Sequence, residues 1–431
     1  MNRYIETDSV PIYNWCPDIE AGALDQMKVI ARLPFVFNHV CLMPDAHAGM
    51  KNGMPIGGVV ACKNVVVPNF VGVDIGCGMC AVKSNLTLSE FNEEKRKELL
   101  HSFHRGIPVG FSHNPEQRKA HLISLYEGQF KDIARNIILP INNNDSLVYS
   151  YPVFGNGDNI VFNAFFDQLG TLGGGNHFIE IQHDEDGWIW IMIHSGSRNM
   201  GKKICDYFND LAIQLNEKWF SNSPIPFLSV NSDEGKAYLE YMNFALKFAY
   251  LNRMVMIEAI KKDISYAFKD VEVKFGEVTN IHHNYASLEN HFGSNVWVHR
   301  KGATLAVSNR FGIIPGSMGT ASYIVKGKDH SPSFSSCSHG AGRRMGRKEF
   351  NRQHNTPEKM KEINDAMAGI TFDGFGKERS FKKNQGHELI DVSESPGAYK
   401  DIDMVMANQK DLVDIVTKLM PVIAMKDVGE E

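Results

Sequence analysis

The stretch WIWIMIHSGSR, residues 188–198, carries the clearest strand signal of the chain. Its apolar run up to His194 has the length of a buried β-strand, and the small residues that follow predict a turn. Comparable apolar runs, bounded by Gly, Pro or Asn, predict strands at 35–43, 56–62, 79–82, 296–299 and 311–314. Because polar side chains converge where strands end in glycine-rich turns, these ends are the expected place of a functional site.

Helical patterns lie between these strands in irregular order. Thr87 and Glu90 form a capping box ahead of apolar residues at helical spacing up to Phe103. The ranges 204–215 and 234–268 also repeat their apolar side chains at helical spacing. Strands and helices mixed without strict βαβ alternation predict an α+β fold rather than a doubly wound sheet. No linker or repeat is visible, so we expect one compact domain over residues 1–431.

The overall composition excludes several classes of protein. The 431 residues are 43% hydrophobic, with 45 basic against 50 acidic side chains, which excludes a disordered or fibrous chain. No apolar run reaches the roughly 18 residues of a membrane span, and the N-terminus lacks a secretory signal, so we expect a cytoplasmic protein with no membrane partner. Seven scattered cysteines, an odd number, argue against a disulfide framework.

Histidines recur beside the polar turns that follow apolar runs. The segments that carry such turns are 43–49, 72–78, 170–180, 193–198, 282–302 and 337–344. The histidines at these places are His177, His194, His283, His299 and His339. A single histidine of this kind is more often a structural donor than a ligand. Five together indicate a metal or phosphate site, and the residues alone leave open which of the two it is.

Asp74 and Cys77, three residues apart in a glycine-rich turn, combine a carboxylate with a thiol. A thiolate can bridge two metal ions while imidazoles complete each shell, a donor set that suits Mn, Zn or Fe. Taken singly, Asp74 is explained as a turn residue and Cys77 as a small buried side chain. Cys77 and Cys80 also form a CxxC pair, but a structural zinc site needs a second pair, and the sequence has none.

Three glycine-rich loops favour an anionic ligand. The ranges 173–176, 315–322 and 340–342 expose backbone N–H groups between small side chains, as anion-binding nests do. Tight turns alone explain one such loop easily and three less easily. None matches the P-loop or the dinucleotide fingerprint, which disfavours ordinary NTPases and dehydrogenases.

Positive charge is concentrated near the last of these loops. Between Lys326 and Lys348 there are six basic residues against one acid, Asp329, although the net charge of the chain is −5. A phosphate-rich partner could dock there, because binding depends on the local charge. A solvated surface is the alternative explanation of such a run.

Together, these segments resemble the RtcB family of RNA ligases. The family motifs PDxHxG, PIGG, GVDIGCG, GTLGGGNHFIE, MIHSGSR, HHN, VHRKGAT, IPGSMGTASY, SHGAGR and AYKDID follow in order from about Met43 to Lys426. The resemblance implies a compact domain with central mixed or antiparallel sheets flanked by helices. It also implies an enzyme of RNA repair or tRNA splicing that joins an RNA 3′-phosphate or 2′,3′-cyclic phosphate end to a 5′-hydroxyl end, using GTP and two Mn²⁺ ions.

The resemblance also implies roles for single residues. His339 becomes the nucleophile that takes GMP from GTP, and Glu180 recognises the guanine edge. One metal ion is held by Asp74, Cys77 and His177, and the second by Cys77, His194 and His283. The implied nucleotide-binding residues are Asn176, His177, Phe178, Ile179, Glu180, His283, Asn284, Pro315, Gly316, Ser317, Met318, Ser322, His339, Gly340, Ala341, Gly342, Tyr399 and Lys426. Arg198, Arg300 and Arg343 are the implied contacts to RNA phosphates.

The chain departs from the commonest family pattern at Gly76 and Cys80, where an Asn and an Arg are usual, so it resembles a divergent subgroup. Two other functions remain open. A binuclear metallophosphoesterase would open cyclic phosphate RNA ends without GTP. An RNA-binding module with a vestigial site would bind RNA whether or not metal is present.

Overall fold

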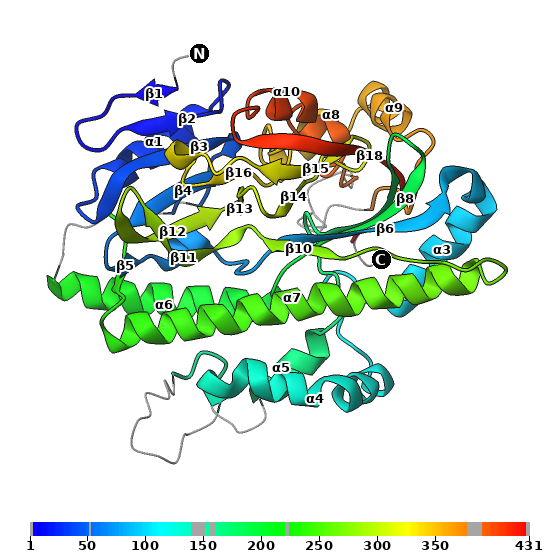
Figure 1. The fold of residues 1–431 in the computed structure, drawn as a ribbon, viewed down its shortest axis with the longest axis horizontal. Coiled ribbons are helices and arrows are strands. Elements are labelled where there is room, and N and C mark those ends of the chain that lie inside the picture. The colour runs from blue at the N-terminus through cyan, green and yellow to red at the C-terminus, as the bar shows by residue number, and fades with distance from the viewer. Residues whose placement is uncertain are drawn as a thin grey trace.

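Two large β-sheets form the centre of the fold (Figure 1). The structure is a computed structural model that describes residues 3–50, 53–138, 151–155, 160–219, 224–376 and 390–427, without the side chains of 218 and 219. One sheet has six strands in the order β1 (Tyr4–Ile5), β2 (Ile12–Asn14), β3 (Val36–His47), β4 (Ile56–Cys62), β12 (Ser294–Lys301) and β11 (Asn284–His291).

The larger sheet has eight strands and carries most of the segments singled out in the sequence. Its order is β10 (Thr279–His282), β6 (Gly78–Thr87), β8 (Trp188–Ser195), β7 (Phe178–His183), β18 (Val413–Met425), β15 (Ser322–Gly327) and β14 (Phe311–Ile314), with β17 (Thr371–Phe372) beside β18. Two small sheets pair β13 (Ala303–Leu305) with β16 (Ser336–Ser338) and β5 (Val65–Val66) with β9 (Leu228–Ser229). Only the β2–β3 and β17–β18 pairs of the described strands are parallel.

Helices cover one side of the sheets in two layers. The long helices α6 (Arg198–Trp219) and α7 (Asp233–Ala267) run side by side, and α4 (Glu116–Ile138) and α5 (Ile160–Gln168) lie beyond them (Figure 1). The other helices are α1 (Ala21–Ala31), α2 (Pro68–Val71), α3 (Glu93–Gly106), α8 (Arg347–His354), α9 (Pro357–Ala366) and α10 (Ile402–Ala407), with 3-10 turns η1 (Leu88–Glu90), η2 (Ser331–Ser333) and η3 (Pro396–Ala398). Helices outside mainly antiparallel sheets confirm the predicted α+β class.

Helix α7 is buried along most of its length. Tyr238, Phe244 and Phe248 pack with α5 and α6 in one core cluster. Further along, Asn252 and Arg253 are fully buried polar side chains. A helix that buries polar groups must satisfy their hydrogen bonds inside the protein, and these two bind the loops of the site described below.

The predicted strands 56–62 and 311–314 coincide with β4 and β14, and 188–194 with β8. The prediction was too short at β3, which continues through Pro44 to His47. An irregularity after Leu42 interrupts the pairing with β4, which resumes at His47 opposite Ile56. The bulge accommodates the proline, which lacks the N–H that a regular ladder requires, and so the strand does not end at Met43.

The predicted capping box is present, but it caps a shorter element than expected. Thr87 and Glu90 cap η1, while α3 begins at Glu93 with Asn92 as its N-cap, whose side chain accepts from the Lys95 N–H at 2.8 Å. All seven cysteines are unpaired and buried, which confirms that there is no disulfide framework. Within the described ranges, no helix has the length and apolar character needed to cross a membrane.

Candidate metal centre and nucleotide pocket

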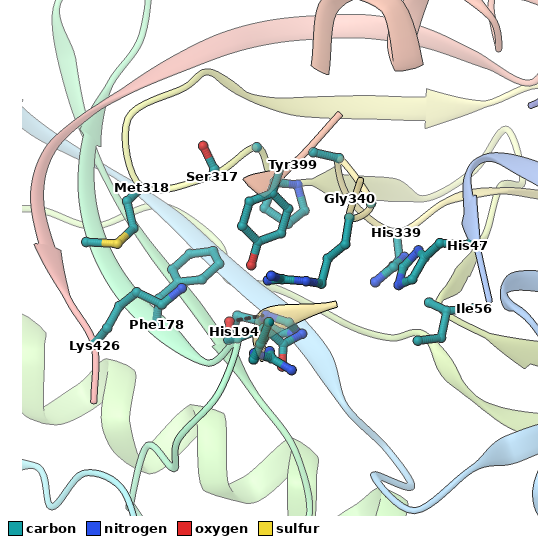
Figure 2. A pocket seen from close by; sticks show the side chains of 17 residues that line it. His47, Ile56, Phe178, His194, Ser317, Met318, His339, Gly340, Tyr399 and Lys426 are labelled. Atoms are coloured by element: carbon teal, nitrogen blue, oxygen red, sulfur yellow. Dashed lines mark hydrogen bonds between the residues drawn. The ribbon is translucent and has the colours of Figure 1, made fainter. Parts of the chain in front are cut away.

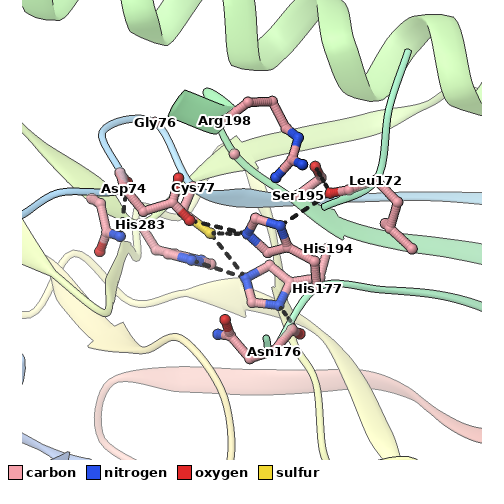
Figure 3. Close-up of polar contacts among 12 residues, drawn as sticks. Asp74, Gly76, Cys77, Leu172, Asn176, His177, His194, Ser195, Arg198 and His283 are labelled. Atoms are coloured by element: carbon pink, nitrogen blue, oxygen red, sulfur yellow. Dashed lines mark hydrogen bonds and ion pairs between the residues drawn. The ribbon is translucent and has the colours of Figure 1, made fainter. Parts of the chain in front are cut away.

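Cys77 lies at the centre of a buried cluster of ligand-type side chains (Figure 3). Its Sγ is 3.4 Å from His177 Nε2 and 3.2 Å from His194 Nε2. His177 Nε2 is also 3.0 Å from Asp74 Oδ2, and His194 Nε2 is 3.3 Å from His283 Nε2. The cluster therefore divides into two groups that share Cys77, the same two groups that the resemblance implied.

The strand order of the larger sheet brings these residues together. Asp74 and Cys77 precede β6, His177 precedes β7, and His194 lies near the end of β8. His283 follows β10, and its backbone N–H donates to the Cys77 carbonyl at 2.8 Å. Because β10, β6, β8 and β7 are neighbours, residues from four distant parts of the sequence meet at one edge of the sheet.

Backbone carbonyls fix the tautomers of two of the histidines. His177 Nδ1 lies 3.0 Å from the Leu172 carbonyl, and His194 Nδ1 lies 3.0 Å from the Asn176 carbonyl. Since a carbonyl only accepts, both Nδ1 atoms carry a proton, which leaves Nε2 as the nitrogen that each neutral ring can offer to a metal ion. This is how metal-binding histidines are held in proteins.

Burial favours the uncharged forms of Cys77, His194 and His283. Burial is the main cause that lowers the pKa of His194 and His283 well below 6.5, so both imidazoles are neutral at neutral pH. It also raises the pKa of Cys77 well above 9.0, with Asp74 adding to the effect. A divalent cation would reverse this preference, because its charge stabilises the thiolate. Imidazoles, a thiol and a carboxylate that face one another in two groups fit two divalent transition-metal ions.

Two residues that the sequence patterns included have structural roles and are not part of the two ligand groups. Cys80 is fully buried in β6 among apolar side chains, and no ligand group formed by described residues includes it. His299 is fully buried in β12, and its Nε2 accepts from the Val67 N–H at 3.1 Å. Cys80 of the CxxC pair and His299 of the five histidines therefore lie outside the cluster.

Helix α7 holds the loops of the cluster through two residues that the sequence did not indicate. Asn252 Oδ1 accepts from the Gly170 N–H at 2.6 Å. Arg253 Nη1 donates to the Gly76 carbonyl at 3.0 Å and to the Ser195 carbonyl at 2.8 Å. In the sequence, Asn252 and Arg253 interrupt an apolar helical pattern, and this interruption is the one sequence feature that could have indicated their role.

A cavity of about 180 Å³ lies beside the metal cluster (Figure 2). Phe178, Met318 and Lys426 lie at one end of it, and His339 and His47 lie at the other. The lining residues that the sequence indicated are Asn176, Phe178, His194, Pro315, Gly316, Ser317, Met318, His339, Gly340, Ala341, Gly342, Arg343, Tyr399 and Lys426. His47, Ile56 and Arg347 also line it, without a role implied by the resemblance.

His339 is oriented by a carboxylate that the sequence did not single out. Its Nδ1 is 2.6 Å from Asp45 Oδ2, which also accepts the backbone N–H groups of His339 and Gly340 at 3.1 and 3.3 Å. Asp45 is fully buried in β3. Because Asp45 Oδ2 accepts a hydrogen bond from Nδ1–H, the neutral form of His339 has its lone pair on Nε2. The ring centroids of His339 and His283 are 4.8 Å apart, which joins the cavity to the metal cluster.

Besides His177 and His283 of the metal cluster, four implied nucleotide-binding residues do not line the cavity. Ser322 Oγ accepts from the Gly316 N–H at 3.2 Å, and Asn284 Nδ2 donates to the Asp74 carbonyl at 3.0 Å. Glu180 is buried in β7, accepts from Gln182, and has its pKa raised to about 8 by burial. Ile179 is in the apolar core. Their contacts to a nucleotide stay predictions.

The three arginines implied for RNA differ in accessibility. Arg343 lines the cavity, and its Nη1 donates to the Ser393 carbonyl at 2.8 Å. Arg198 is half-buried at the start of α6, and its Nη2 donates to the Gly110 carbonyl at 2.7 Å. Arg300 is fully buried, with Nη2 3.0 Å from Glu289 Oε2. Contact of Arg300 with RNA would require this ion pair to open, and all three contacts stay predictions.

Comparison with known proteins agrees with the geometry. The family described as "tRNA-splicing ligase RtcB" matches residues 26–427. The "RNA-splicing ligase RtcB" of Escherichia coli K12 is 35% identical over 98% of both chains, and the "RNA-splicing ligase RtcB1" of another E. coli strain is 36% identical over the same shares. The "tRNA-splicing ligase RtcB" of Thermococcus kodakarensis is 29% identical over 92% of this chain and 89% of its own. The ordered motifs, the shared-cysteine cluster and these matches over nearly the whole length together show that the chain belongs to the RtcB family.

Proposed function

We propose that the protein is a GTP- and Mn-dependent RNA ligase. It joins RNA ends that carry a 3′-phosphate or a 2′,3′-cyclic phosphate to 5′-hydroxyl ends, through a guanylyl group carried by His339. The observation that carries this proposal is the position of His339, with its free Nε2, between the cavity and the metal cluster. We place the activity in the cytoplasm, in RNA repair or tRNA splicing, with residues 1–431 acting as one domain.

Two Mn²⁺ ions suit the two ligand groups. Asp74, Cys77 and His177 would hold one ion, and Cys77, His194 and His283 the other. Ions held there would stabilise negative charge on phosphoryl oxygens and lower the pKa of bound water. The chain itself supplies the alignment, because carbonyls hold the imidazoles with their lone pairs inward.

The cavity suits GTP with its α-phosphate at His339 and its base at the Phe178 end. The glycine-rich turn 340–342 supplies small residues next to the nucleophile, and Arg343 supplies positive charge. His339 Nε2 attacks the α-phosphate, and pyrophosphate leaves with the bonding electrons. Asp45 stabilises the imidazolium that results, since its Oδ2 already accepts a hydrogen bond from the Nδ1–H group.

The later steps consume the RNA ends. A cyclic phosphate is first opened by water to a 3′-phosphate. An oxygen of that 3′-phosphate then takes GMP from His339, which restores the free imidazole. Finally the 5′-hydroxyl attacks the activated phosphate, a phosphodiester forms, and GMP leaves. Arg198 and Arg343 are the proposed contacts to RNA phosphates, because both have part of their side chains outside the core.

A sealing assay separates this function from the metallophosphoesterase. RNA with a 2′,3′-cyclic phosphate end and RNA with a 5′-hydroxyl end are incubated with Mn²⁺, with or without GTP and with or without chelator. The ligase produces joined RNA only with GTP and Mn²⁺. A phosphoesterase opens the cyclic phosphate without GTP and joins nothing, and this outcome would refute the ligase assignment.

A further inference from the structure

Lys400 is an almost buried lysine to which neither the sequence motifs nor the family resemblance assigned a role. Its side chain is 9% exposed, and its Nζ lies 3.0 Å from Cys16 Sγ and 3.0 Å from Asp18 Oδ1. Nζ also donates to the Ala46 carbonyl at 3.1 Å. Cys16 Sγ in turn lies 3.2 Å from Asp18 Oδ1. An amine, a thiol and a carboxylate therefore meet in one group, which we call the Lys400 cluster.

The Lys400 cluster contacts both segments that surround the nucleophile. Ala46, whose carbonyl accepts from Nζ, follows Asp45 in β3. The backbone N–H of Lys400 donates to the Gly342 carbonyl at 2.9 Å. Asp45 orients His339, and Gly342 belongs to the glycine-rich turn that lines the nucleotide cavity. A chemical change at Lys400 Nζ therefore alters hydrogen bonds directly beside the residue that orients His339.

The distance between Lys400 Nζ and Cys16 Sγ is short enough for a reaction between the two atoms. It is shorter than the 3.4 and 3.2 Å that separate Cys77 Sγ from the imidazole nitrogens of the metal cluster. Groups held about 3 to 3.5 Å apart react as an intramolecular pair, far faster than with a partner from solution. Sulfenic acids condense with nitrogen nucleophiles to sulfenamides. A sulfenic acid formed at Cys16 therefore meets the Lys400 amine before any other reagent.

A small oxidant can reach the cluster although Cys16 is fully buried. A cavity of about 340 Å³ lies beside the cluster, and Asp18, Ala46 and Lys400 are among its lining residues. The cavity admits molecules of the size of water, and hydrogen peroxide is little larger. The Asp18 side chain is 65% exposed, so the cluster meets solvent on that side. Burial raises the pKa of the Cys16 thiol to about 12, against the effect of Lys400, so oxidation is slow and requires a lasting excess of oxidant.

We propose that Cys16 and Lys400 are a modification site, at which hydrogen peroxide produces a reversible covalent bond between Sγ and Nζ. Peroxide oxidises the thiol by two electrons to a sulfenic acid and is itself reduced to water. Lys400 loses one proton to water through Asp18, and its amine attacks Sγ. The S–O bond breaks, and the hydroxyl leaves as water with a second proton from the amine. The sum is R–SH + R′–NH₃⁺ + H₂O₂ → R–S–NH–R′ + 2 H₂O + H⁺. A thiol reductant reverses the link and ends as its own disulfide.

The link changes the hydrogen bonds beside the nucleophile. An ammonium group has three N–H donors, whereas the sulfenamide nitrogen has one and carries no charge. Lys400 therefore cannot keep its bonds to both Asp18 and the Ala46 carbonyl. Loss of one such bond next to Asp45 is expected to slow transfer of GMP to His339 by about 2 to 10-fold. This effect rests on the proposed function, and the covalent link itself does not.

Mass spectrometry of the full-length protein tests the link. The protein is treated with excess hydrogen peroxide, its free thiols are alkylated, and it is digested. The expected product is a pair of joined peptides, containing Cys16 and Lys400, whose mass is the sum of the two less two hydrogen atoms. Dithiothreitol is expected to separate them. Neither Cys16→Ser nor Lys400→Arg should give the pair, because a guanidinium stays protonated and does not attack sulfur. In Lys400→Arg, sulfinic and sulfonic acid at Cys16 should increase instead.

Cys205 is the control within the same protein. It is also buried, and its Sγ contacts two oxygens, the Pro68 carbonyl and Asn69 Oδ1, each at 3.8 Å. Its peptide is expected to form no link to a lysine. If Cys16 in the peroxide-treated protein stays a thiol, or reaches the sulfinic acid with no joined peptide, the inference is overturned.

Transfer of α-labelled GMP from GTP, with Mn²⁺, tests the effect on the nucleophile. Peroxide is removed, and the treated protein is compared with equally treated Cys16→Ser, because oxidation of Cys77 slows both alike. The protein with Cys16 is expected to lose about 2 to 10-fold more of its rate, and brief reduction before the assay should restore the difference. Equal losses overturn the coupling to His339. If untreated protein takes no label from GTP, the proposed function fails, while the joined peptide still decides the link.

Discussion

At the scale of single residues, hydrogen bonds at Nδ1 of three histidines determine which ring nitrogen is available to a metal ion or a phosphate. His177 and His194 donate from Nδ1 to backbone carbonyls, while His339 donates from Nδ1 to Asp45. In the neutral form of each ring the lone pair is therefore on Nε2. Two of these lone pairs face Cys77 and suit metal ions, and the third faces the cavity and suits attack on phosphorus.

Replacing Asp45 by Asn is expected to slow guanylylation by a factor of about 10² to 10⁴, because the amide allows the wrong tautomer of His339 and cannot stabilise the imidazolium. Single-turnover transfer of α-labelled GMP measures the rate, and equilibrium binding measures GTP affinity. The affinity is expected to change little, since the carboxylate lies behind the ring. An Asp45→Asn protein that labels at the normal rate would contradict the role of Asp45.

The cluster around Cys77 was predictable from the sequence, and the carboxylate behind His339 was not. Asp74, Cys77, His177, His194 and His283 each lie in an ordered motif, and the structure brings all five together. Asp45 also lies in a motif, but Pro44 beside it predicts the end of a strand. Its contact with His339 spans 294 positions of sequence, which no local pattern reveals.

At the scale of elements, helix α7 acts as the support of the metal loops. Arg253 is fully buried and ties the Gly76 loop to the end of β8 through two carbonyls. Arg253→Met keeps most of the volume but removes the two hydrogen bonds that Arg253 donates to these carbonyls. We expect the affinity for Mn²⁺, measured by calorimetric titration, to fall by about 10 to 100-fold.

The control for this prediction is Lys247→Ala, an exposed position on the same helix. It is expected to keep the Mn²⁺ affinity of the unmodified protein. Unchanged Mn²⁺ affinity in a folded Arg253→Met protein would show that the loops hold their positions without the helix.

Strands β11 and β12 are joined by the ion pair of Glu289 and Arg300. Burial would raise the pKa of Glu289, but Arg300 and neighbouring hydrogen bonds lower it far below the usual 4.5. Glu289→Gln leaves the buried Arg300 charge without its partner, and we expect a loss of about 3 to 5 kcal/mol in the free energy of unfolding at pH 7. Urea unfolding of the two proteins measures the difference.

The same pair predicts a direction of pH dependence. A carboxylate with a lowered folded-state pKa stabilises the fold above its unfolded pKa, near 4.5, and loses that contribution as the pH falls toward its folded value. The stability gap between the unmodified protein and Glu289→Gln should therefore shrink below about pH 4.5. The exposed pair of Glu272 and Lys274 gives the control, since Glu272→Gln should cost under about 1 kcal/mol. A gap that widens in acid would refute this assignment.

Regular elements were predictable where the pattern is local. β4, β8 and β14 follow from apolar runs with clear ends, and α7 follows from its helical spacing. β18 was missed, although it has 13 residues, because Pro421 in its interior argues against a central strand. The pairing of β18 with β7 has an irregular register between Pro421 and Ile423, which accommodates the proline. The sequence does not predict this irregularity.

At the scale of the whole molecule, the sheet order creates the site. β10, β6, β8 and β7 are neighbours in space although their order in the chain is different, so the side chains of the cluster, which span residues 74 to 283, reach one edge. The α+β class was predictable from the mixture of patterns, but the strand order depends on long-range pairing. The net charge of −5 is likewise a property of the whole chain, and it does not describe the cavity, whose lining includes the basic residues Arg343, Arg347 and Lys426.

The central claim is that His339 carries GMP in a metal-dependent step, and label transfer tests it most directly. The full-length protein is incubated with α-labelled GTP and Mn²⁺ and separated under denaturing conditions. Label is expected on the unmodified protein, and its loss is expected in the presence of chelator and in His339→Ala. Label that persists on a folded His339→Ala protein would contradict the assignment of the nucleophile and with it the proposed ligase mechanism.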